Sequence, residues 1–168
     1  MPKIVRDIIG AAKYGLLISV LMTGMILQQA CVQKRDQWQF VVTDPRSGTV
    51  YYTETIEPDD TFSLSYRHSV SLSPVVGVFL FTEDGMIKPL STTYTSYGPG
   101  LPLDYTEDYV VDNGMITVHH QEEPREAIRL WATPQTEETI LLDNNLYPLY
   151  NLSEGHILLE LSLIKKRP

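Results

Sequence analysis

The residues best suited to chemistry lie in SYRHSVSLSPV (65–75), where an arginine and a histidine stand among four serines. A histidine next to a serine suggests a general base beside a nucleophile. In an extended strand, however, successive side chains point to opposite faces. On that geometry His68 and Ser69 point apart, so the sequence predicts no catalytic pair between them.

The longer stretch FSLSYRHSVSL (62–72) predicts a strand with an apolar row and a polar row. The apolar row contains Phe62, Leu64, Tyr66, His68, Val70 and Leu72, and the polar row contains Ser63, Ser65, Arg67, Ser69 and Ser71. His68 then has two interpretations. It is a buried histidine whose ring nitrogens bond to backbone or tyrosine groups, or it is a ligand contact or pH-sensitive group at a strand end.

Arg67 is the candidate in this stretch for binding a carboxylate. Its simpler interpretation is a surface ion pair with one of the many acidic residues. Elsewhere, His119 and His120 are adjacent and, together with His156, do not have the spacing of metal ligands. We therefore predict no catalytic residue, no metal and no cofactor.

A second motif, YTSYGPGLPLDY (94–105), predicts a stiff loop after a strand rich in tyrosine and threonine. Gly98 and Gly100 permit an irregular backbone path, and Pro99 and Pro102 stiffen it by fixing φ. Its tyrosines give the loop aromatic walls. The loop is either a structural corner or a recognition loop, and the residues alone leave both open.

The elements that must position these residues are strands. Apolar and polar residues alternate from Gln37 onward, and turn signals recur every eight to twelve residues. The hairpin signals are Asp84-Gly85, Asn113-Gly114 and Asp143-Asn144-Asn145. We predict an all-β fold of about nine to eleven strands, an antiparallel β-sandwich or a partly open barrel, preceded by one N-terminal transmembrane or signal helix.

The charges divide the chain into an N-terminal segment, residues 1–35, and a domain, residues 36–168. The segment has five basic residues and one acidic residue, whereas the domain has eight basic and twenty acidic ones. The domain therefore has a net charge near −12. Such a surface repels nucleic acid and anionic lipid, so we expect no nucleic-acid partner.

Residues 14–27, YGLLISVLMTGMIL, contain no charge and follow a basic start, as in an export signal. The uncharged run continues to Gln33, which makes it long enough to cross a bilayer as a signal anchor. Cys31 offers the alternative of a lipoprotein signal that is cleaved before this cysteine and lipidated there. These two routes place the domain in the periplasm or extracytoplasmic space, tethered to the cell inner membrane or, for a lipoprotein, alternatively to an outer membrane. The remaining interpretations are a signal that is cleaved and releases the domain, and a helix of the domain core.

Taken together, the two motifs resemble the bacterial family catalogued as domain of unknown function 1850. The residues that match its pattern are Phe62, Tyr66, His68, Ser69, Val70, Pro74 and Val75, followed by Gly98, Gly100, Leu101 and Pro102. The resemblance covers about residues 38–164. Ser71 and Gly77 stand where members of the family commonly have acidic residues.

The resemblance implies an association with tripartite, binding-protein-dependent transporters of the TRAP type, in particular the TAXI subclass. We therefore expect a non-enzymatic accessory domain that docks on the membrane subunits or on the substrate-binding protein. The expected binding residues are Tyr66, Arg67, His68, Ser69 and Pro74, with the loop Gly98, Gly100, Leu101 and Pro102. The alternatives are a free-standing module that binds a small ligand or glycan, and a small hydrolase using His68.

Overall fold

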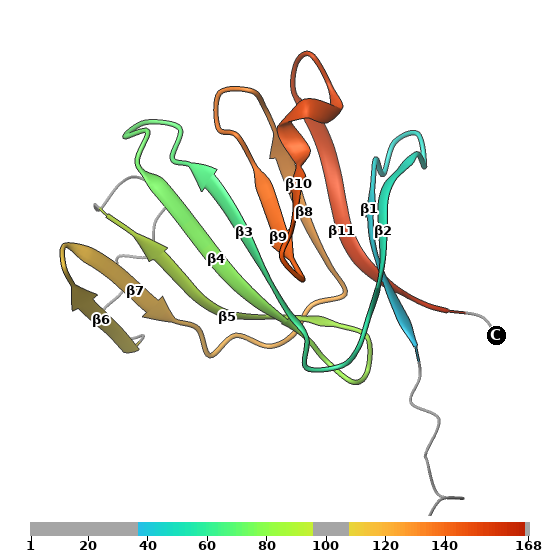
Figure 1. Cartoon of the computed structure of the whole chain (residues 1–168), viewed down its shortest axis with the longest axis horizontal. Coiled ribbons are helices and arrows are strands. Elements are labelled where there is room, and N and C mark those ends of the chain that lie inside the picture. The colour runs from blue at the N-terminus through green and yellow to red at the C-terminus, as the bar shows by residue number, and fades with distance from the viewer. Residues whose placement is uncertain (1–36, 96–107, 167–168) are drawn as a thin grey trace, which may run out of the picture. The chain divides into compact units, whose positions relative to one another are not determined.

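The computed structural model describes residues 37–95 and 108–166, and their strands form two antiparallel sheets (Figure 1). The four-stranded sheet has the order β2-β1-β11-β8. Its strands are β1 (Trp38–Thr43), β2 (Val50–Ile56), β8 (Ala127–Ala132) and β11 (Ile157–Lys165). The N-terminal segment with Cys31, and the loop with Gly98, Gly100, Leu101 and Pro102, lie outside the described residues.

The seven-stranded sheet has the order β10-β9-β3-β4-β5-β7-β6. Its strands are β3 (Thr61–Arg67), β4 (Pro74–Phe81), β5 (Ile87–Tyr94), β6 (Asp108–Asp112), β7 (Met115–His119), β9 (Thr139–Leu142) and β10 (Asn145–Pro148). The prediction of an antiparallel all-β fold is confirmed. The described strands form two open sheets and do not close into a barrel.

Tight turns connect the hairpins where the sequence has Asn, Asp and Gly. Asn113 and Gly114 have φ values of 48° and 78° and join β6 to β7. Asp143 and Asn144, with φ values of 47° and 62°, join β9 to β10. Two successive residues with positive φ match the twist of antiparallel strands, which is why these residue types mark the hairpins.

The two sheets bury one main core between them. It combines Phe40 and Leu161 of the four-stranded sheet with Phe62 and Phe81 of the seven-stranded sheet. The ring of Phe62 lies 5.1 Å from that of Phe40 and 5.1 Å from that of Phe81, measured between centroids. Leu159 and Leu161 of β11 are fully buried, as the alternation of residues 156–164 indicates.

A second, smaller cluster lies within the seven-stranded sheet and contains Val75, Tyr94, Ile116 and Val118. Its members come from β4, β5 and β7, and Tyr66 of β3 packs against them. The register sets Tyr66 opposite Val75, and Val75 opposite Tyr94. This row connects the histidine-containing motif to the strand that precedes the glycine–proline loop.

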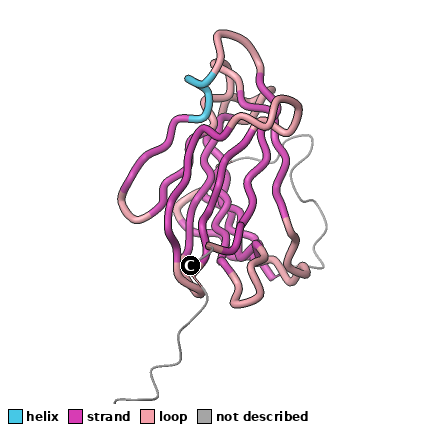
Figure 2. Tube along the Cα trace, turned by 90° about the vertical axis from the view of Figure 1, so that its right-hand side faces the viewer, coloured by secondary structure: helices cyan, strands magenta, loops and turns pink. Residues whose placement is uncertain are grey.

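Helix is scarce in the part of the chain that the structure describes. The 3-10 helix η1 (Leu149–Leu152) is the helical segment at one end of the strands in Figure 2. No described helix is long and apolar enough to cross a membrane.

Candidate functional site

The predicted strand over 62–72 is shorter in the structure, because β3 ends at Arg67. Phe62 and Leu64 are buried as the alternation predicts. The prediction that Val70 and Leu72 face the interior is wrong: they are 71% and 61% exposed. Leu72 has a φ of 55°, which is incompatible with an extended strand, so residues 68–73 form a turn between β3 and β4.

His68 organises this turn from a buried position, with 5% of its surface exposed. Its backbone N–H donates to the Ser73 carbonyl at 2.9 Å, and its own carbonyl accepts from the Leu72 N–H at 2.8 Å. The ring atom Nδ1 accepts from the backbone N–H groups of Val70, at 3.3 Å, and Ser71, at 3.2 Å. Nδ1 accepts these two bonds through its lone pair, so the turn occupies this atom of the ring.

The structure also separates His68 from the neighbouring serine. Ser69 is exposed, whereas the His68 ring is buried and its Nδ1 is used by the turn. The buried interpretation of His68, with a ring nitrogen bonded to backbone groups, is therefore the one that the structure bears out. The side chain is buried even though the strand pattern that predicted this ends one residue earlier.

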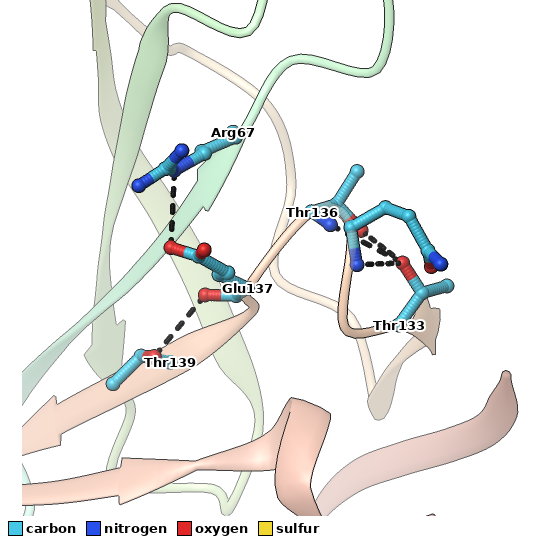
Figure 3. A network of polar contacts seen from close by, with 6 residues as sticks. Arg67, Thr133, Thr136, Glu137 and Thr139 are labelled. Atoms are coloured by element: carbon cyan, nitrogen blue, oxygen red, sulfur yellow. Dashed lines mark hydrogen bonds and ion pairs between the residues drawn. The ribbon is translucent and has the colours of Figure 1, made fainter. Parts of the chain in front are cut away.

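Arg67 forms an ion pair with Glu137, with 3.0 Å between Nε and Oε2 (Figure 3). Both side chains are about half exposed, so this is the surface ion pair that the simpler interpretation predicts. The Arg67 backbone N–H also donates to the Thr136 carbonyl at 2.7 Å. These two contacts attach the end of β3 to the segment 133–138.

The segment 133–138 is a turn stabilised by threonine hydroxyls. The Oγ1 atoms of Thr133 and Thr136 lie 2.8 Å apart, and Thr133 Oγ1 accepts from the backbone N–H groups of Gln135 and Thr136 (Figure 3). The Thr139 hydroxyl donates to the Glu137 carbonyl at 3.1 Å. Hydroxyl contacts of this kind replace ladder bonds where the chain leaves one sheet for the other.

Glu138 is the residue at this site that sequence reasoning missed. Only 7% of its surface is exposed, and its Oε2 accepts from the Thr133 backbone N–H at 2.8 Å. Burial, and secondarily the charge of Glu138, raise the pKa of the Tyr66 hydroxyl. The string TEET (136–139) gives no periodic signal for a buried acid. The hint that the sequence offers is the pair Thr133 and Thr136, whose spacing of three residues is typical of a turn.

Two further positions that the family resemblance singles out, Pro74 and Gly77, lie on β4. Pro74 is exposed and begins β4, directly opposite Arg67. At Gly77, where the family resemblance leads us to expect an acid, a Cβ atom would lie 2.9 Å from Cε2 of Phe79. The Phe79 ring thus fills the space that a larger side chain at Gly77 needs.

A groove of about 560 Å³ lies at a different part of the domain. It is lined by Leu141 and Tyr147 and by four carboxylates, which belong to Glu54, Glu57, Asp60 and Asp143. Tyr147 donates from its hydroxyl to Oε1 of Glu54 at 2.7 Å. None of the described residues predicted for the binding site lines this groove.

The other histidines do not gather around a common point. His119 is exposed, and Nε2 of His120 lies 2.8 Å from Oγ1 of Thr92. Within residues 37–95 and 108–166, no group of three or more His, Cys, Asp or Glu side chains is arranged to hold a metal ion.

A family model described as "Domain of unknown function (DUF1850)" matches residues 62–149. The match covers just over half of the chain and includes the histidine turn and the segment 133–138. Comparison with curated proteins and with solved structures gives no match.

Proposed function

The chain belongs to the DUF1850 family, and from this premise we propose that it is a non-enzymatic accessory domain that acts by docking on other proteins. The partners we propose are the membrane subunits or the substrate-binding protein of a TAXI-type TRAP transporter. Residues 1–35 tether the domain to the inner membrane, by a signal anchor or through a lipid on Cys31. The domain itself is extracytoplasmic.

The observation that carries this proposal is the role of His68. A histidine that serves as a general base needs a lone pair directed at the proton it removes. Here Nδ1 accepts from the Val70 and Ser71 N–H groups, and the ring is buried. Since the motif histidine uses this atom to hold a turn, the motif favours displaying a surface over reacting with a substrate.

The site's surroundings support docking at the same place. The exposed ion pair of Arg67 and Glu137 lies beside the histidine turn, and the hydrogen bond from the Arg67 N–H to the Thr136 carbonyl joins the segment 133–138 to β3. Binding residues are commonly found on turns that a rigid scaffold holds in place. A membrane tether raises the effective concentration of the domain near a membrane partner, so modest affinity suffices for docking.

The experiment is affinity purification of the full chain from cross-linked membranes, together with solute uptake by cells that lack it. We expect the transporter subunits to be recovered with the protein and uptake to fall on deletion. Recovery of no transporter subunit, with unchanged uptake, would contradict the proposal.

A further inference from the structure

The turn 68–73 presents two apolar side chains to solvent among serine side chains. Val70 is 71% exposed and Leu72 is 61% exposed. The residues between and beside them are the serines 69, 71 and 73, and the hydroxyls of Ser71 and Ser73 lie 2.7 Å apart. Two large aliphatic groups therefore project from a short turn in which the residues beside them are serines.

The backbone of this turn is held in place against an unfavourable conformation. Leu72 has a φ of 55°, a region that Gly or Asn enters more easily than leucine. The hydrogen bonds of His68 to residues 70–73 maintain it. Strain that the surroundings hold in place is common at binding sites, because it fixes side chains before the partner arrives.

We propose that Val70 and Leu72 are paired anchors that insert into an apolar pocket on a partner protein, and that His68 is the positioning residue that presents them. This rests on the proposed docking function and adds to it the contact residues and the chemistry of the partner's surface. The pocket takes two branched aliphatic side chains, and its rim offers a hydrogen-bonding group to the exposed hydroxyl of Ser69.

A protein pocket fits these residues better than a lipid surface. The domain, residues 36–168, has twelve more acidic than basic residues, so an anionic bilayer repels it. The turn has neither the lysine or arginine nor the tryptophan that segments lying in a membrane interface use. The nearby Arg67 is already paired with Glu137.

Photocrosslinking in intact cells tests the proposal with the full chain. A benzophenone amino acid at position 71 leaves both anchors in place, and the same group at Ser47, an exposed residue of the β1–β2 turn, is the reference site. We expect position 71, but not position 47, to give an adduct with one protein, identified by mass spectrometry. The pair V70S and L72S should lower its yield about tenfold or more.

The matched control is the pair V50S and L146S, which removes a valine and a leucine that are 55% and 68% exposed elsewhere. We expect this pair to leave the adduct unchanged. If V70S and L72S do not reduce the adduct at position 71, the proposed role of Val70 and Leu72 as anchors is wrong. It is also wrong if position 71 gives no adduct, or an adduct with lipid only. An adduct that these substitutions do reduce, with a protein outside the transporter, supports the anchors and overturns only the proposed transporter partner.

The positioning role of His68 has a separate test in the same assay. H68A removes the acceptor at Nδ1, whereas Oδ1 of the asparagine in H68N can accept from the same two N–H groups. We expect H68A to lower the adduct yield about as much as V70S and L72S do, and H68N to restore most of it. Thermal denaturation verifies that each variant is folded at the assay temperature. Equal yields from wild type and H68A would overturn the positioning role.

Discussion

Nδ1 of His68 lies 3.2 Å from the backbone nitrogen of Ser71 and accepts its hydrogen. His68 thus bonds to its own chain three residues later and closes the turn that follows β3. That bond uses the lone pair that a catalytic base would need. It also holds the turn that we propose for docking.

His68→Ala should destabilise the domain by about 1–3 kcal/mol, because it leaves two backbone N–H groups without their acceptor and removes a buried ring. Urea denaturation of the domain measures this loss. Ser69→Ala, at the exposed neighbour, is the control and should change stability by less than about 0.5 kcal/mol. Similar stabilities for the two variants would contradict the role assigned to the ring.

Gly85→Ala should be more damaging than Gly48→Ala. Both glycines have positive φ, 79° and 74°, so either alanine incurs the left-handed penalty of about 1–2 kcal/mol. A Cβ at Gly85 would also overlap the indole ring of Trp38, whereas nothing lies within 4 Å of one at Gly48. Urea denaturation of both variants isolates the Trp38 contact as their difference. Equal losses would mean that the indole moves aside without cost.

The ion pair of Arg67 and Glu137 should contribute little to stability. Both side chains are about half exposed, so a double-mutant cycle of R67A and E137A should give a coupling of about 0.2–1 kcal/mol. Raising the salt concentration should reduce this coupling by screening. A coupling above this range, or one that salt does not change, would contradict the assignment of a solvent-exposed ion pair.

Alkaline pH should destabilise the domain through Tyr147. Burial, followed by the hydrogen bond and the charge of Glu54, raises the pKa of its hydroxyl from 10.0 to about 12. The folded state therefore keeps this proton where the unfolded state has lost it, so the stabilisation is complete below pH 10 and declines as the pH rises to about 12. The free energy of unfolding, measured between pH 8 and 12, should fall less steeply in Y147F.

The strands were predictable because their residues alternate and their turns have the right chemistry. Phe62 and Leu64 face the core as period two requires, and Asn113-Gly114 occupies a turn that needs positive φ. The alternation misled at Val70 and Leu72 because a side chain ended the strand. Nδ1 of His68 accepts from the N–H groups of Val70 and Ser71, which in a longer strand would be available to bond to neighbouring strands.

The segment 133–138 could not be placed from sequence for a different reason. Arg67 and Thr136 lie 69 positions apart, yet the Arg67 N–H donates to the Thr136 carbonyl. The burial of Glu138 depends on this pairing of distant segments and on the N–H of Thr133. Local patterns contain no information on the contact between Arg67 and Thr136, so the buried acid next to Tyr66 emerged only from the folded chain.

Amide hydrogen exchange of the full chain, with and without the purified transporter in detergent, tests most directly whether the histidine turn is the docking surface. We expect that the transporter slows exchange at the amides of residues 69–73, and that V70S with L72S abolishes this protection. The β9–β10 turn, Asp143 and Asn144, should exchange at the same rate in both samples. Unchanged exchange at 69–73, with protection confined to another surface of the domain, would contradict docking through this turn.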